Sequence, residues 1–379
     1  MTKKRSSRSR KSPGRSLGVG RSNGPGHTGA KVTARVRGLG ELLALVPYQL
    51  GFDPGKSIVA LVISGGVLRG LARLPEHEEG WDAVPSEAWG AVAQTVQTAW
   101  LRGAARPPRD SRGADGAILV AYDLPLEEAW QACSILSYVC ALAGVPVCDE
   151  VTVVDGRWCR LGEERSGTRE AVPAPADVPA VSEFVGLGIA PVKDRDGLRA
   201  RFAEDPDRSG PVAEALEAIR SGRIAVDVSL GVRAIGEWLT SAGTADSPQD
   251  CVTTAQGLLL LEQPMWRDAI YDQVAPALTR VVVVTALEQA ARSRIPQCAG
   301  QMDAMLADVA PAAPAGDRSH LLTIAAVAAW AEGRGSTAWA AAEMALEDDP
   351  THGMANTVRT CLWHGLSVDP AEWGLRRSA

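Results

Sequence analysis

The chain has 379 residues, 46% of them hydrophobic, so it is long enough for two domains and can bury a sizeable core. No run approaches the roughly 18 apolar residues of a membrane-spanning helix, and the basic start lacks the apolar segment of a secretory signal. Seven cysteines without a C-x-x-C pair are typical of reduced thiols. These features predict a cytoplasmic protein with no membrane partner.

The net charge of −6 is unevenly distributed along the chain. Residues 1–37 hold eleven Lys and Arg and no Asp or Glu, which leaves 28 basic and 45 acidic residues elsewhere. A basic segment rich in Ser, Gly and Pro is typical of a disordered tail. Its charge suits weak, non-specific contact with nucleic acid. Composition favours a solvated tail without a partner, or an artefact of an upstream start codon.

Helical and strand patterns alternate over residues 38–160 and predict an α/β domain with a mixed sheet. Residues 39–46 have one apolar helical face, and Pro47 is poorly tolerated further along that helix. Residues 57–63 are apolar and rich in β-branched side chains, which indicates a buried strand. Further helices are expected over residues 89–100 and 125–143, and further strands over 67–74, 117–122, 145–154 and 157–160.

Residues 161–180 are rich in Gly, Pro and Ala and are interpreted as a linker. The helical period dominates residues 181–379, which predicts an all-α domain ending in a helical hairpin array. Ser336 and Thr351 are expected to cap the last two helices. Earlier helices are expected over residues 195–202, 212–221, 228–240, 250–261, 266–274, 281–292, 302–309 and 321–332.

The tripeptide Gly55-Lys56-Ser57 looks like the end of a phosphate-binding P-loop. Leu50 stands where that motif needs its first glycine, and the motif requires a strand before the loop and a helix after it. The predicted order here is helix, loop, strand. We therefore interpret the tripeptide as a turn that leads into a strand.

No recognisable catalytic or metal-binding motif is present. H-E-x-x-H, G-x-S-x-G and Rossmann sequences do not occur. His77, His320, His352 and His364 are far apart in sequence and lack metal-ligand spacing. No catalytic residue, metal or cofactor is therefore predicted.

The run VPYQLGFDPGKSIVALVI, followed by Arg73 on the next strand, resembles the start of the domain of unknown function 4192 family of high-GC Gram-positive bacteria. The segment Gly156-Arg157-Trp158 and the pair Arg267-Asp268 are also similar to that family, and the resemblance spans residues 38–373. A Cys-rich insertion of the family is absent, with GEERSGTREA in its place. The resemblance implies a bacterial protein. It implies no activity, because that of the family is itself unknown.

Four polar residues at predicted strand ends form the candidate ligand-binding set: Ser57, Arg73, Asp123 and Arg157. Asp123 follows an apolar strand, at the sheet edge where open α/β folds place ligands. It also suits the N-cap of the next helix, which composition favours. The two arginines can clamp an anion, although such residues more often pack their stems along a sheet. Arg267 and Asp268 are interpreted as an interhelical salt bridge.

Two functions remain open from sequence. The first is a non-enzymatic binding or scaffolding protein, with a groove for a ligand or partner between the two domains. The second is an enzyme or sensor that acts on a small anionic ligand at the sheet edge near the four candidate residues. The lack of a catalytic motif favours the first.

Overall fold

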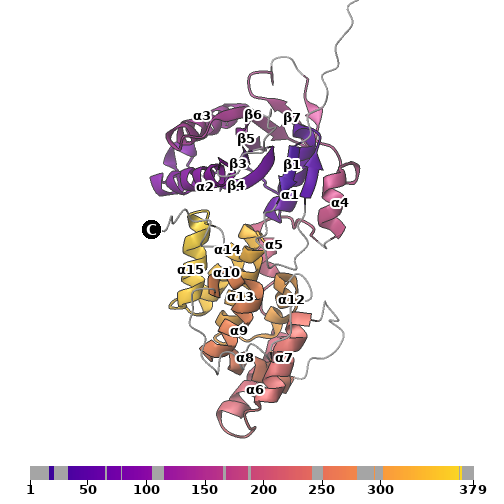
Figure 1. Cartoon of the computed structure of the whole chain (residues 1–379), viewed down its shortest axis with the longest axis vertical. Coiled ribbons are helices and arrows are strands. Elements are labelled where there is room, and N and C mark those ends of the chain that lie inside the picture. The colour runs from indigo at the N-terminus through magenta and orange to yellow at the C-terminus, as the bar shows by residue number, and fades with distance from the viewer. Residues whose placement is uncertain are drawn as a thin grey trace, which may run out of the picture.

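The computed structural model of the chain has a sheet domain followed by a helical domain (Figure 1). The predicted fold class, a mixed α/β domain followed by a helical one, is confirmed. The structure describes residues 17–20, 33–64, 66–77, 79–104, 115–164, 168–186, 189–240, 251–279, 294, 302–366 and 368.

The sheet has eight strands in the order β2-β1-β4-β3-β5-β6-β7-β8, with parallel pairs β1–β4 and β5–β6 and antiparallel pairs elsewhere. Its central strand β3 is buried along its whole length, as the apolar run predicted. The strands are β1 (Leu17–Gly20), β2 (Thr33–Val36), β3 (Ser57–Ser64), β4 (Val67–Pro75), β5 (Gly116–Tyr122), β6 (Val147–Val154), β7 (Arg157–Arg160) and β8 (Glu170–Ala171).

Helices cover both faces of this sheet. The side chains of Val59, Leu61 and Ile63 pack with α1 (Leu39–Leu50) and α4 (Pro179–Gly186). The alternate side chains of β3, such as Ala60, pack with α2 (Ser86–Ala104) and α3 (Leu126–Leu142). This alternation follows from the two-residue period of a strand, and it gives the sheet domain two cores.

Helix α1 continues past Pro47, which we expected to be unfavourable within it. Pro47 lies inside the helix, and Gly51 ends it in the left-handed conformation with φ of 84°. The amide of Gly51 donates to the carbonyl of Pro47 at 2.7 Å. Glycine adopts this backbone conformation without steric cost, so the sharp end of the helix depends on Gly51.

Parts of the predicted tail and linker contain regular structure. Strands β1 and β2 lie within residues 1–37, whereas residues 1–16 and 21–32 of that segment are outside the described part. Within the predicted linker, β8 pairs with β7, a short 3-10 helix spans Pro175–Asp177, and α4 begins at Pro179. The edge of the sheet therefore extends into the sequence interpreted as a linker.

The helical domain is built around α13, which is buried almost all round by its neighbours. Gly231 and Gly257 allow α7 and α8 to approach closely, since a Cβ on either would overlap a side chain of the other helix. The expected helix over residues 281–292 lies outside the described residues. The helices are α5 (Arg195–Ala200), α6 (Pro206–Arg220), α7 (Val228–Thr240), α8 (Cys251–Leu261), α9 (Pro264–Val274), α10 (Pro276–Thr279), α12 (Met302–Val309), α13 (Ser319–Ala331), α14 (Gly335–Asp348) and α15 (Gly353–Trp363).

Two helix caps differ from the prediction. Arg334 rather than Ser336 is the N-cap of α14. The N-cap of α15 is His352, whose ring nitrogen accepts from the amide of Ala355, and not Thr351. Asn, Asp, Ser and Thr are the usual capping residues, so a histidine cap is hard to predict from sequence.

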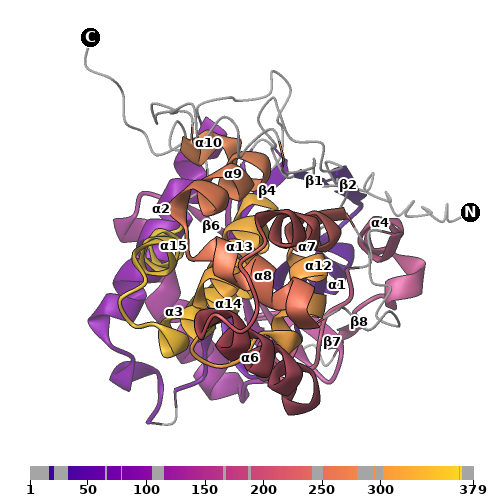
Figure 2. The same cartoon turned by 90° about the horizontal axis from the view of Figure 1, so that it is seen from below.

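The two domains meet where the end of α1 contacts α5 and α14 (Figures 1 and 2). Ala340 of α14 is fully buried within the core that α1 and the sheet share. Phe52 forms an isolated parallel bridge with Val192 in the segment that leads to α5. The domains are thus joined by buried apolar contact as well as by the chain itself.

Candidate functional site

The register places all four residues predicted from strand ends at the same end of the sheet. Ser57 pairs with Tyr122, which immediately precedes Asp123, and Arg73 lies on β4 opposite Val59. Arg157 begins β7, four strands away from β4 in the sheet order. Strands are spaced by about 4.8 Å, so Arg73 and Arg157 are separated by roughly 19 Å along the sheet.

Ser57 and Arg73 are brought together by one carbonyl oxygen. The hydroxyl of buried Ser57 donates to the carbonyl of Pro54 at 3.0 Å. Nε and Nη2 of Arg73 donate to the same oxygen at 3.0 and 2.6 Å, and its guanidinium lies over the ring of Phe52. These contacts hold the turn between α1 and β3 against the sheet.

The other two candidates have different local partners. Asp123 is not the N-cap of α3, because Pro125 occupies that position. Its carboxylate instead accepts from the amide of Asp155 at 3.3 Å, and its backbone has φ of 48°. Arg157 donates to the carbonyl of Arg169 at 2.6 Å, which fastens β7 to the following segment. The four residues therefore share one end of the sheet, but only Ser57 and Arg73 share a contact, the carbonyl of Pro54.

Charge and burial are unusual around Arg73. Burial, then the nearby Arg195, lowers the pKa of Arg73 to about 10, while Asp53 opposes the shift. Burial, together with Asp53 and Asp123, raises the pKa of Tyr122. The buried hydroxyl of Tyr122 has no hydrogen-bond partner among the described residues. Two cations close together at a partly buried position favour a bound anion.

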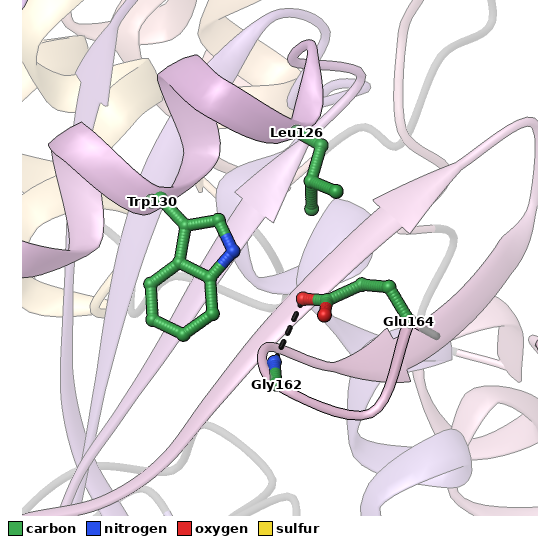
Figure 3. A pocket seen from close by; sticks show the side chains of 4 residues that line it. All are labelled: Leu126, Trp130, Gly162 and Glu164. Atoms are coloured by element: carbon green, nitrogen blue, oxygen red, sulfur yellow. Dashed lines mark hydrogen bonds between the residues drawn. The ribbon is translucent and has the colours of Figure 1, made fainter. Parts of the chain in front are cut away.

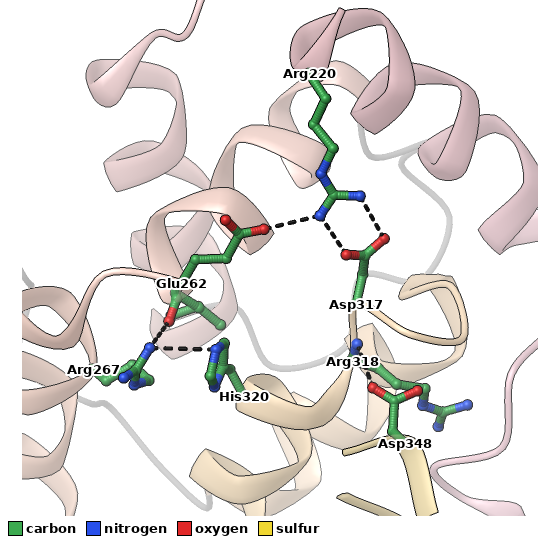
Figure 4. A network of polar contacts seen from close by, with 8 residues as sticks. Arg220, Glu262, Arg267, Asp317, Arg318, His320 and Asp348 are labelled. Carbon is green, nitrogen blue, oxygen red and sulfur yellow. Dashed lines mark hydrogen bonds and ion pairs between the residues drawn. The ribbon is translucent and has the colours of Figure 1, made fainter. Parts of the chain in front are cut away.

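A second polar cluster lies in the helical domain, at the N-terminal end of α13 (Figure 4). It encloses a cavity of about 360 Å³, within the usual range for small-molecule sites. Helices α8, α13 and α14 and the connecting segments contribute its lining residues, which are Leu258, Glu262, Gly316, Asp317, Ser319, His320, Asp348, Asp349 and Pro350. We call this cavity the polar pocket.

Most of the carboxylates in the polar pocket form hydrogen bonds or ion pairs with other groups of the protein. Arg220 forms a bidentate ion pair with Asp317 and donates to Oε1 of Glu262 at 2.9 Å. Asp348 accepts from the amides of Arg318 and Ser319, so it binds the first turn of α13. One oxygen of Asp349 accepts from Thr351. Oε2 of Glu262 and Oδ2 of Asp349 have no partner among the described residues.

Two histidines lie beside these carboxylates, and their hydrogen bonds determine which ring nitrogen of each carries the hydrogen. Nδ1 of His352 accepts the amide of Ala355, so its hydrogen is on Nε2. That nitrogen lies 2.7 Å from Nδ1 of His320 and donates to it. His320 then carries its own hydrogen on Nε2, 3.4 Å from Nη1 of Arg267. With this tautomer the 3.4 Å approach of the two nitrogens is not a hydrogen bond, and Nη1 of Arg267 donates to the carbonyl of Leu261 instead.

Both histidines are held neutral at pH 7. Burial, then Arg267 and His352, lowers the pKa of His320 to about 4, against the opposing effect of Asp349. Burial also lowers the pKa of His352, again opposed by Asp349. The causes are physical, since a buried cation loses hydration and a neighbouring guanidinium repels it.

Residues 40–369 match the family described as domain of unknown function (DUF4192). The chain belongs to this family. A search of curated proteins and a search of solved structures each found no match. Within the part of this DUF4192 chain that the structure describes, no helix is long and apolar enough to cross a membrane. In the same residues, no group of three His, Cys, Asp or Glu could hold a metal ion.

Sequence reasoning on this DUF4192 chain missed the polar pocket as a site. It singled out Arg267 only through the family resemblance, and the structure gives that guanidinium two neighbours, the carbonyl of Leu261 and His320. His320 and His352 were set aside because they are 32 residues apart. The one local signal was their position next to helix starts, since α13 begins at Ser319 and α15 at Gly353.

Proposed function

We propose that this protein is a non-enzymatic binding protein whose ligand occupies the polar pocket. The observation that carries the proposal is the set of open hydrogen-bonding groups there. Nε2–H of His320 is a donor, while Oε2 of Glu262 and Oδ2 of Asp349 are acceptors. A small molecule with a carboxylate and an amine, such as an amino acid, matches both kinds of group.

Binding fits these contacts better than catalysis. A general base needs a lone pair that is free to take a proton. Nδ1 of His352 already accepts from Ala355, Nδ1 of His320 from His352, and Asp317 and Asp348 from protein donors. Glu262 and Asp349 keep an open oxygen each, and in this proposal those oxygens bind the amine of the ligand. The pocket also lies within the helical domain, whereas the sequence suggested a groove between the domains.

The test is a thermal-shift and calorimetric titration of the full chain with amino acids, simple amines and simple carboxylic acids at millimolar concentration. We expect amino acids to raise the melting temperature more than either single-function class. Glu262→Gln should weaken that binding by about tenfold, the effect of losing one charged hydrogen bond. Glu127→Gln, an exposed carboxylate on α3, is the matched control and should leave binding unchanged.

Two results would contradict the proposal. One is a panel in which amino acids stabilise the protein no more than the single-function compounds. The other is a bound compound that is recovered chemically changed after incubation, as followed by NMR, which would make the protein an enzyme.

An alternative proposal places a small anionic ligand at the sheet edge, for an enzyme or a sensor. The lowered pKa of Arg73 beside Arg195 and the unpartnered hydroxyl of Tyr122 support it. The contacts of Ser57, Arg73 and Arg157 with main-chain carbonyls weigh against it. Titration with inorganic phosphate distinguishes the two, because Arg73→Gln should abolish binding at the sheet edge and leave the polar pocket unaffected.

A further inference from the structure

Helix α3 carries apolar side chains on both its buried and its exposed face. Ala132, Leu136 and Cys140 are buried against the sheet. The outer face exposes four large apolar side chains, which we call the α3 stripe: Leu126 (42%), Trp130 (41%), Tyr138 (65%) and Leu142 (70%). A surface helix normally places polar residues on that side. Large apolar side chains grouped on the exposed side of one helix are typical of an interaction site.

The α3 stripe has the geometry of a helix-packing ridge. Its members follow a four-residue spacing from Leu126 to Leu142, with Ser134 at the intervening position. Ridges of this spacing fit into the grooves of a second helix. Sixteen residues at 1.5 Å each give it a length of about 24 Å, enough for four turns of a partner helix. Figure 1 shows that α3 lies at the side of the sheet domain facing away from the helical domain.

A cavity at one end of the stripe offers a place for an anchoring side chain (Figure 3). It has a volume of about 510 Å³ and is lined by Leu126 and Trp130 on α3 and by Gly162 and Glu164 on the loop after β7. The carboxylate of Glu164 accepts from the amide of Gly162 at 2.8 Å, which fixes the loop beside α3. Buried anchors in such pockets contribute much of the affinity of an interface.

The charge around the stripe defines the partner. Helix α3 and residues 161–164 together carry Glu127, Glu128, Glu163 and Glu164 and contain no Lys or Arg, while Arg160 just before them is paired with Asp149. We propose that the α3 stripe binds an amphipathic helix of a partner protein, with Lys or Arg beside its apolar stripe. A second copy of this chain would bring two acidic rims together, and nucleic acid or an anionic membrane would be repelled.

The experiment measures fluorescence anisotropy of a labelled synthetic helix in which Leu recurs with helical spacing and Lys fills the other positions. We expect binding to the full chain that weakens with salt. Trp130→Ser/Tyr138→Ser should reduce affinity by at least about tenfold, since both side chains are large and central. Glu127→Gln/Glu128→Gln should lower the salt dependence. Val226→Ser, an exposed apolar residue in the helical domain, is the control and should bind like the unchanged protein.

Three results would overturn the proposal. They are equal binding of a scrambled peptide of the same composition, equal binding by the Trp130→Ser/Tyr138→Ser variant, and a dimer in sedimentation equilibrium that this variant dissociates. The last would assign the stripe to a second copy of the chain. The substituted side chains are exposed, so circular dichroism should show an unchanged fold. The polar pocket is in the other domain, so these results are independent of the function proposed above.

Discussion

Protonation of the His320–His352 pair would remove the hydrogen bond that joins the two rings, because both facing nitrogens would then carry hydrogens. The pKa values of both rings are lowered in the folded protein, that of His320 to about 4. The unfolded chain, with histidines titrating near 6.5, therefore binds more protons below that pH. The contribution of the neutral histidines to the free energy of unfolding is fully present above about pH 6.5 and is lost as the pH falls towards 4.

We predict that this pair makes the free energy of unfolding fall by about 1 to 2 kcal/mol between pH 7 and pH 4.5, after allowing for the partial exposure of His320. The variant His320→Gln/His352→Asn removes both titrating groups, and Asn keeps a good capping residue before α15. Urea denaturation across this range should show a shallower pH dependence for the variant than for His77→Gln. If the free energy of unfolding depends equally on pH in both variants, the prediction that the two histidines are neutral in the folded protein is wrong.

At the level of single residues, sequence reasoning was limited by contacts between distant segments. It placed Ser57, Asp123 and Arg157 at strand ends correctly, because strand boundaries follow from the local apolar pattern, while Arg73 lies two residues inside β4. It could not find that Ser57 and Arg73 share a carbonyl oxygen, since the turn at Pro54 depends on how α1 ends. The contact of His320 with His352 likewise depends on the packing of α13 with the start of α15.

At the level of elements, close packing of α7 against α8 depends on Gly231. A Cβ there would lie 2.5 Å from Cδ1 of Leu260 and 2.8 Å from the carbonyl oxygen of Gln256. In Gly231→Ala, the higher helix propensity of alanine stabilises the protein by up to about 1 kcal/mol. The added methyl group overpacks the contact between α7 and α8, which costs about 1 to 3 kcal/mol. We predict net destabilisation in urea. Gly90→Ala is the matched control, because α2 is open there and propensity should stabilise the protein.

A stabilised Gly231→Ala variant would mean that α7 and α8 can separate without loss of stability.

Most helices and strands were predictable from sequence because their apolar periodicity is strong, as in α7 (Val228–Thr240), whose bounds match the expected ones. Helix α1 was harder, since Pro47 is unfavourable in isolation. The buried contacts of Leu45, Val46 and Leu50 around it stabilise the helix enough to continue to Gly51.

At the level of the whole molecule, the contacts between the two domains could not be predicted from sequence. The sequence led us to expect a groove between the domains. Ala340 of α14 is fully buried in the core formed by α1 and the sheet. A second contact joins the domains at another place, where His364 at the end of α15 lies 2.5 Å from Oε1 of Gln94 on α2. Because apolar contacts between the domains are buried, separating the domains exposes surface in both. We therefore expect the domains to unfold as one cooperative unit.

Ala340→Asp should uncouple them, since an unpaired carboxylate at a fully buried position costs about 3 kcal/mol or more. Hydrogen exchange followed by mass spectrometry should then show α1 and α14 opening at different denaturant concentrations, where the unchanged protein opens both together. Thr357→Asp adds the same charge on the exposed side of α15 and should preserve the coupling. If α1 and α14 still open together in Ala340→Asp, the buried alanine contributes little and the domains are joined by other contacts, such as that of Gln94 on α2 with His364 at the end of α15.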